Sequence, residues 1–311
     1  MTKIIGVDIG GTKTSIGIVD IKSGKILKKI SIPSKKNAND KKNLDFIISQ
    51  TLSLAKNTSI KKIGIGVPEL INNKGIIRGA YNFKWHNKNL AQYFPKSFLV
   101  KVDSDVRCHL RAEKFYGHGK KNNNFIYVNI GTGLSYSHYK NNRIYSGANG
   151  FAIHFASSNI SLFDPKNEKK VSLTPEDLYS GKAIMQYLIK TKSTKKKSKY
   201  LNNISESLAS LIGNLINSVD PGLIVLGGGV VLNNSEFRKL LIRHTRKFIF
   251  CDDVKSIKIL LSKLKVEEPV IISSTDGVGT SASFKNPTGI TTDGTSLYVA
   301  DQYNHKIRKI E

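Results

Sequence analysis

A glycine-rich turn near the start of the chain carries residue types that can bind a phosphorylated ligand. It runs from Asp8 to Thr14 and reads Asp-Ile-Gly-Gly-Thr-Lys-Thr. Gly10 and Gly11 would let the backbone approach a phosphate closely, Thr12 can donate a hydrogen bond to its oxygens, and Asp8 can hold a metal ion or its water. A Gly-Gly turn is also the default connection of a hairpin without a ligand. The turn therefore predicts a phosphate site only if other parts of the chain complete it.

Two further glycine runs follow predicted strands. Gly131-Thr132-Gly133 comes after the apolar run 125–130, and Gly227-Gly228-Gly229 comes after the run 223–226. The second run can be explained as a parallel strand with a flexible exit. Three glycines directly after Ile-Val-Leu are, however, the kind of opening across which a purine can lie.

Three polar side chains could act on a bound substrate. Asp105 stands where the predicted strand 98–102 passes into a helix, and an aspartate there is by default a helix cap. Asn82 lies in an aromatic loop, where its default role is to form a turn. Glu176 follows Pro175, a common arrangement in the first turn of a helix. Each residue has a structural as well as a functional interpretation.

Strands and helices alternate along the chain, which predicts sheets covered by helices. Strands are predicted at 4–9, 16–19, 25–32, 61–68, 98–102, 125–130, 223–226 and 257–261, and helices at 44–55, 105–116, 201–219 and 235–249. Residues 190–199 have the composition of a charged connector. The 311 residues suffice for two domains, which we place at 1–117 and 118–274, with a separate tail at 275–311.

The net charge of +26 comes from lysines spread over the whole chain. Such a charge can attract nucleic acid, but no aromatic residues interleave the lysines to stack on bases, so we expect no specific nucleic-acid partner. The absence of a signal peptide and of a long apolar run predicts a cytoplasmic protein without a membrane partner. Cys108 and Cys251 are far apart and fit a reducing compartment without disulfides.

Taken together and in this order, the three glycine-rich stretches resemble the motifs of the ROK family of sugar kinases and repressors, in its glucokinase-like branch. The resemblance covers about residues 3–274. It implies an α/β fold of two domains, the actin-like and hexokinase-like (ribonuclease H-like) ATPase fold, with ATP and the sugar in the cleft between them. It also suggests a homodimer.

The resemblance assigns a role to each motif. Asp105 would be the catalytic base, because the family places its base in an Asn-Asp-Ala-like motif where this chain has Ser104-Asp105-Val106. Asp8 would serve Mg²⁺. The phosphates of ATP would be held by Gly10, Gly11, Thr12, Lys13, Gly131, Thr132 and Gly133; its adenosine would face Gly227, Gly228 and Gly229; and the sugar would contact Asn82, Asp105, His154 and Glu176.

The chain departs from the family pattern at three places. The glycines that usually follow Gly133 are replaced by Leu-Ser-Tyr-Ser-His. The family sequence Gly-Glu-Ile-Gly-His, which contacts the sugar and zinc, is replaced by 153–157, so that His154 and Ser157 stand where the family has glutamate and histidine. The cysteine-rich zinc motif is also missing from 158–173, which predicts a zinc-independent protein.

The tail from Thr275 to Ile310 resembles one NHL repeat, the blade unit of a β-propeller. A propeller needs several blades to bury its strands, so one unit cannot close. We expect a loosely held hairpin, a fusion remnant or an interaction tail that contacts another protein.

These observations predict an ATP-dependent kinase that phosphorylates a hydroxyl of a hexose or N-acetylhexosamine, with Asp105 as general base. The main alternative is a sugar- or nucleotide-binding protein that keeps the fold and has lost the reaction. An interaction module built on the tail is a weaker hypothesis. A repressor is weaker still, because the family's repressors carry an N-terminal DNA-binding domain and this chain begins at the phosphate hairpin.

Overall fold

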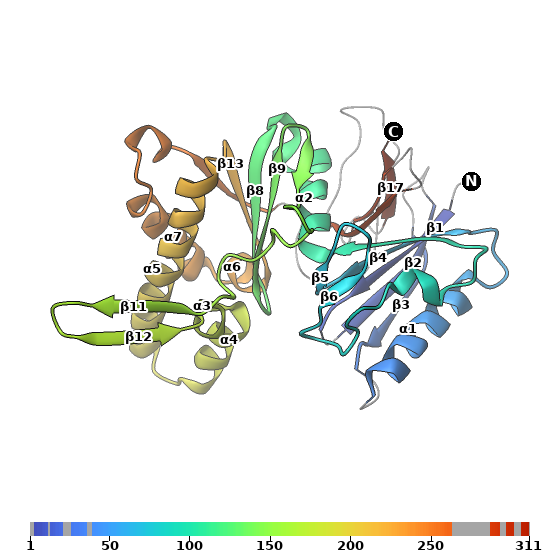
Figure 1. The fold of residues 1–311 in the computed structure, drawn as a ribbon, viewed down its shortest axis with the longest axis horizontal. Coiled ribbons are helices and arrows are strands. Elements are labelled where there is room, and N and C mark those ends of the chain that lie inside the picture. Colours follow the sequence, from blue (N-terminus) through green and yellow to red (C-terminus); the bar gives the residue numbers. More distant parts are fainter. Residues whose placement is uncertain are drawn as a thin grey trace. The chain divides into compact units, whose positions relative to one another are not determined.

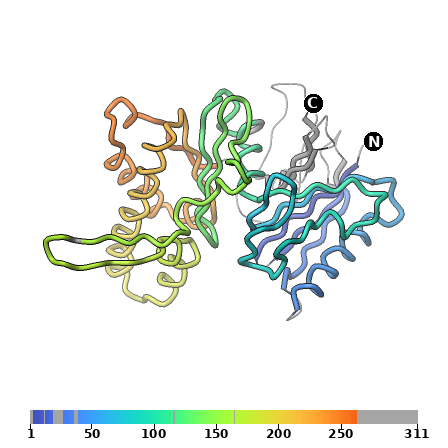
Figure 2. Tube along the Cα trace, in the orientation of Figure 1, coloured from blue at the N-terminus to red at the C-terminus, as the bar shows by residue number. Residues whose placement is uncertain are grey.

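The computed structural model describes residues 3–11, 13–20, 26–35, 39–262, 287–292, 297–301 and 306–310. The chain divides into two compact units. The first unit comprises Met1–Asn122, Ser137–Ala152 and Ser262–Glu311, and the second comprises Asn123–Tyr136 and Ile153–Leu261. Figure 1 labels the elements, and Figure 2 follows the course of the chain by residue number.

The first unit is built on a five-stranded sheet with the order β3-β2-β1-β4-β7. Its strands are β1 (Lys3–Ile9), β2 (Lys13–Asp20), β3 (Ile26–Pro33), β4 (Lys62–Val67) and β7 (Leu99–Ser104). The first three strands form an antiparallel meander, whereas β4 pairs in parallel with both β1 and β7. The carboxyl ends of β1, β4 and β7 therefore lie at the same edge of the sheet.

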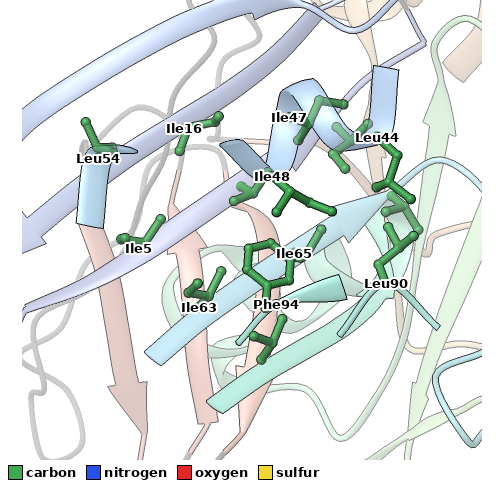
Figure 3. Close-up of a cluster of buried hydrophobic side chains, with 14 of the residues drawn as sticks. Ile5, Ile16, Leu44, Ile47, Ile48, Leu54, Ile63, Ile65, Leu90 and Phe94 are labelled. Carbon is green, nitrogen blue, oxygen red and sulfur yellow. The ribbon is translucent and has the colours of Figure 1, made fainter. Parts of the chain in front are cut away.

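Helix α1 (Asp40–Ala55) covers one face of this sheet with an apolar stripe at helical spacing. It begins four residues earlier than the predicted start at residue 44, because the Asn39 side chain caps it by accepting the N–H groups of Lys41 and Lys42. Figure 3 shows the resulting core, in which Leu44, Ile47 and Ile48 of the helix lie over Ile5, Ile63 and Ile65 of the strands.

Smaller elements complete the first unit. Helix α2 (Asp105–Tyr116) follows β7 directly, which confirms the predicted helix after this strand and its end at Tyr116. The others are β5 (Leu70–Ile71), β6 (Ile77–Gly79), η1 (Leu90–Tyr93) and η2 (His118–Lys121).

The second sheet has the order β10-β9-β8-β13-β14. Its strands are β8 (Asn124–Ile130), β9 (Leu134–Lys140), β10 (Arg143–Tyr145), β13 (Leu223–Gly227) and β14 (Lys258–Leu261). Strand β13 pairs in parallel with β8 and with β14. The residues after Gly133, where the family has glycines, thus form a strand, and Leu134 is buried in the core.

Two helices contribute many residues to the second core. Helices α5 (Thr194–Val219) and α7 (Ser235–Lys247) pack against each other and against β8 and β13. The prediction of a connector over 190–199 holds only for 191–193, because Lys190 ends α4 and Ser193 caps α5 by accepting the N–H group of Lys196. Further elements are α3 (Pro175–Tyr179), α4 (Gly181–Lys190), α6 (Gly229–Asn233), η3 (Asp252–Val254) and the hairpin of β11 (Ile160–Asp164) and β12 (Lys169–Leu173).

The described parts of the tail form an antiparallel three-stranded sheet, β15 (Pro287–Thr292), β16 (Leu297–Asp301) and β17 (Lys306–Ile310). This agrees with the predicted β character of the tail. Residues 263–286, where the family's closing helix and the start of the NHL-like unit were expected, lie outside the described residues.

The helices of the described part of the chain were also compared with the requirements of a membrane span. None of them combines the length and the apolar character that crossing a bilayer requires.

Candidate active site

The ends of β1, β4 and β7 place two predicted site residues, Asp8 and Asp105, at one edge of the first sheet. The register pairs Asp8 of β1 with Gly66 of β4, and Gly66 with Asp103 of β7. Asp105 follows two residues later as the first residue of α2. Asp8 and Asp105, which are 97 positions apart in the sequence, therefore belong to the same edge of one sheet.

The predicted phosphate hairpin is the β1–β2 connection. The N–H group of Gly10 donates to the carbonyl oxygen of Lys13 at 2.9 Å, and a Cβ atom on Gly10 would lie 2.9 Å from the same oxygen. A Cβ atom on Gly11 would lie 3.1 Å from Oδ1 of Asn82. The structure thus places the side chain of Asn82 against the hairpin. Thr12 lies outside the described residues, and the Lys13 side chain is exposed.

Asp105 has one restrained and one available oxygen. Its Oδ1 accepts the N–H group of Val106 at 2.6 Å and the hydroxyl of Ser104 at 3.4 Å. Within the described residues, Oδ2 accepts no hydrogen bond. Burial raises the pKa of Asp105 to about 6, although these two hydrogen bonds oppose the rise. A carboxylate with a pKa near the operating pH suits a general base.

An ion cluster around the buried Arg107, which the sequence analysis did not identify, holds the start of α2. Arg107 donates through Nε to Oδ1 of Asp103 at 2.6 Å, through Nη1 to the carbonyl oxygen of Gly150 at 2.7 Å, and through Nη2 to that of Ile71 at 3.1 Å. Arg111 pairs with the other oxygen of Asp103. Burial alone would raise the pKa of Asp103, but Arg111 and Arg107 more than offset this and hold it below its usual range.

In the loop of Asn82, the aromatic residues belong to the core, whereas Asn82 itself is partly accessible. Phe83 and Trp85 are buried core residues whose rings stack at 4.1 Å. Asn82 remains half-buried, and its Nδ2 donates to the carbonyl oxygen of Pro68 at 2.8 Å. The backbone of this loop is bonded to the carboxylate of Glu69, a second residue that the sequence analysis missed.

The two other glycine runs lie next to each other in the second unit. Parallel pairing sets Gly227 of β13 opposite Asn129 of β8, so both loops leave the same sheet edge. The first loop turns tightly, since the N–H group of Gly131 donates to the carbonyl oxygen of Gly133 at 3.1 Å. Gly228 has φ +100°, and a Cβ atom there would lie 2.3 Å from the carbonyl oxygen of Ile130. The glycine is therefore required by the close approach of the two loops.

Replacing Gly228 by alanine should disrupt this edge. We expect a loss of about 1 to 3 kcal/mol in stability from the backbone conformation alone, and the loop must also move away from Ile130. Gly229→Ala is the matched control for stability, since a Cβ atom on Gly229 would meet nothing within 4 Å. Thermal melts of the two variants beside wild type would test this. Equal melting temperatures of the two variants would contradict the prediction.

The predicted sugar residues of the second unit form a hydrogen-bonded row. The Ser157 hydroxyl lies 2.8 Å from Nδ1 of His154 and donates to Oε2 of Glu176 at 2.6 Å. The N–H group of Leu134 also donates to Oε2, at 3.1 Å. Burial lowers the pKa of His154, while Glu176 and the Leu134 carbonyl oppose that shift. The structure therefore brings His154 and Glu176 together and adds Ser157 between them.

A metal ion can be held by protein side chains alone or by a carboxylate together with substrate phosphates. In the described part of the chain, no group of three or more His, Cys, Asp or Glu side chains could hold a metal ion. Mg²⁺ in phosphate-transferring sites is bound by one or two carboxylates together with substrate phosphates. Asp8, at a strand end beside the glycine hairpin, fits that second kind of site.

The strand orders, the parallel strand ends and the glycine loops define the class of the protein. It has the two-domain α/β fold of actin-like and hexokinase-like proteins, and solved structures of this fold match most of the chain. The model of the ROK family matches residues 4–157 and 166–271. The chain belongs to the ROK family.

Its relatives include kinases and repressors. A glucokinase of Thermotoga maritima is 25% identical over 262 residues, which cover 73% of this chain and 82% of the relative. A xylose repressor of Caldicellulosiruptor bescii is 24% identical over 256 residues, covering 70% and 63% of the two chains. The crystal structure of a ROK family glucokinase from Streptomyces griseus, in complex with glucose and AMPPNP, matches with a TM-score of 0.67 and 19% identity, covering 84% of this chain and 94% of that one.

Proposed function

We propose that the protein is an ATP-dependent carbohydrate kinase that transfers the γ-phosphate to a hydroxyl of a hexose or an N-acetylhexosamine. The observation that carries this proposal is Asp105, whose Oδ2 accepts no hydrogen bond from the described residues and whose pKa is about 6, at the sheet edge that also bears Asp8. The glucokinase relative supports the same reaction class.

The chain's own residues account for the steps of such a transfer. Oδ2 of Asp105 accepts the proton of the sugar hydroxyl as its oxygen forms a bond to the γ-phosphorus, and the bond from that phosphorus to the bridging oxygen of ADP breaks. Gly10, Gly11 and Gly131 let backbone N–H groups approach the phosphates. Asp8 would hold Mg²⁺ or its water, and the ion would supply positive charge against the phosphates.

Further residues position the two substrates. We assign contacts with the sugar hydroxyls to Asn82, and to His154 and Glu176, which Ser157 links by hydrogen bonds. Gly227, Gly228 and Gly229 face the adenosine, where Gly229 leaves open space. Thr12, Lys13, Thr132 and Gly133 complete the phosphate contacts. Zinc takes no part in this proposal.

A binding protein without catalysis is the second candidate. It is favoured by His154 and Ser157, which stand at the positions of the family's glutamate and histidine, and by a relative that is a xylose repressor. In either case we propose a cytoplasmic homodimer in which the tail, if it is an NHL-like unit, contacts another protein.

The test is ADP release with Mg-ATP over a panel of hexoses and N-acetylhexosamines, with wild type beside Asp105→Asn. The proposal expects turnover on one sugar class that is lost in the variant. A silent panel in which ATP or a sugar still raises the melting temperature would overturn catalysis and favour the binding protein.

A further inference from the structure

Glu69 is a buried carboxylate next to the Gly-x-Pro turn that ends β4. Its residue is 3% exposed, and an ionised group so deep is costly unless hydrogen bonds replace water. Three successive backbone N–H groups do so. Tyr81 donates to Oε2 at 2.7 Å, and Asn82 and Phe83 donate to Oε1 at 2.9 Å each.

These three donors belong to the loop that carries Asn82. The side chain of Asn82 is held from the same turn, because its Nδ2 donates to the carbonyl oxygen of Pro68, the residue before Glu69. Its Oδ1 lies against Gly11 of the phosphate hairpin. The turn at Pro68 and Glu69 therefore fixes both the backbone and the amide of Asn82.

Glu69 also lies within electrostatic reach of Asp105. Burial raises the pKa of Glu69, the three N–H groups of the loop oppose this, and the charge of Asp105 adds to the rise. Asp105 itself is faced by Arg107 and Asp103 of its own segment. The register agrees, because Val67 and Ser104 are paired at the ends of β4 and β7, so Glu69 and Asp105 follow the ends of neighbouring strands.

We propose that Glu69 is a positioning residue of the sugar site, which fixes the Asn82 loop through three backbone hydrogen bonds and thereby sets a sugar hydroxyl in reach of Asp105. This inference rests on the proposed kinase function. Misplacement of a substrate-orienting group by about 1 Å can cost on the order of 100-fold in rate, so a residue that touches no substrate can still control turnover.

Glu69→Gln is the informative variant because it keeps the shape of the side chain. Its amide oxygen can still accept from Asn82 and Phe83, but its NH₂ group then faces the N–H group of Tyr81, donor against donor. Glu113→Gln is the matched control. Glu113 is equally buried, lies in the same unit, and accepts the N–H group of His118 at 2.9 Å and the Ser262 hydroxyl at 2.7 Å.

Two measurements test the proposal. Amide hydrogen exchange at residues 81–83 should accelerate in Glu69→Gln and stay at the wild-type rate in Glu113→Gln. The KM for the sugar should rise roughly 10-fold or more in Glu69→Gln, with the KM for ATP unchanged, and neither should move in the control. Equal increases in the two KM values, or the same sugar effect in Glu113→Gln, would overturn the positioning role.

Failure of the kinase proposal would look different. If wild type phosphorylates no sugar, the same variants are compared by calorimetric binding of the sugars of the panel. A Kd raised roughly 10-fold by Glu69→Gln alone upholds the role of Glu69 in a binding protein. An unchanged Kd, an absence of sugar binding by wild type, or unchanged amide exchange overturns it.

Discussion

Asp105→Asn is expected to lower kcat by about 10²- to 10⁴-fold, because the amide keeps the shape of the carboxylate but cannot accept the proton of the attacking hydroxyl. Oδ1 can still accept from Val106, so the start of α2 should keep its geometry. Wild-type kcat/KM should in turn fall as the pH drops below about 6, where Asp105 is protonated. ADP release measured between pH 5 and 8 would show both effects.

The same variant should be more stable than wild type at neutral pH. The folded-state pKa of about 6 exceeds the ordinary value of 3.8, so the folded chain disfavours the carboxylate. This costs about 3 kcal/mol above the folded pKa, and the cost fades as the pH falls from about 6 toward 3.8. Asparagine removes it. The melting temperature of Asp105→Asn should therefore exceed that of wild type at pH 7.5, and the two should converge near pH 4.

Asp103→Asn is the control of opposite sign, two residues away. Arg111 and Arg107 hold the pKa of Asp103 below its usual range, so its charge stabilises the fold at neutral pH and this contribution is lost only in acid. The control should melt below wild type at pH 7.5. If Asp105→Asn keeps the wild-type kcat, Asp105 is not the general base. If it melts below wild type at neutral pH, burial does not destabilise the Asp105 carboxylate.

Much of the architecture was predictable because local pattern and tertiary structure agree. The helix at Asp105 and the β1–β2 hairpin follow from apolar spacing and glycine placement, and both are present. The lysines after Ser193 have the composition of a connector, but most of their side chains are exposed on a helix whose core contacts begin further along. Lysine is a good helix former, and composition alone hid the start of α5.

The missed residues owe their roles to contacts distant in sequence. Glu69 binds N–H groups 12 to 14 positions away, and Arg107 reaches Gly150, 43 positions away. No spacing rule marks such partners. A weak signal did exist, since Asp103 and Arg107 have the i, i+4 spacing of an ion pair and Glu69 follows an otherwise apolar strand. The predicted sugar residues His154 and Glu176 are also distant in sequence, and in the structure Ser157 links them by hydrogen bonds.

Arg107→Ala is expected to cost about 3 to 5 kcal/mol in the stability of the first unit, since breaking a buried ion pair leaves the partner charge uncompensated. The side chain is 4% exposed and serves Asp103 together with two carbonyl oxygens. Those carbonyls belong to Ile71 and Gly150, which pack so tightly that a Cβ atom on Gly150 would lie 2.7 Å from the Ile71 oxygen. Without the guanidinium, two carbonyl dipoles and a carboxylate lose their shared donor.

Arg107→Lys separates charge from geometry at this site. An ammonium keeps the positive charge but offers one point in place of a planar fork, so it cannot reach Asp103, Gly150 and Ile71 together. Arg107→Ala should lower the melting temperature by roughly 10 °C. We expect Arg107→Lys to recover only a minor part of that decrease. Arg246→Lys is the control, because that partly exposed arginine also donates to two backbone carbonyls but forms no ion pair with an acid among the described residues. A melting curve of Arg107→Lys that coincides with wild type would mean that charge alone holds the start of α2.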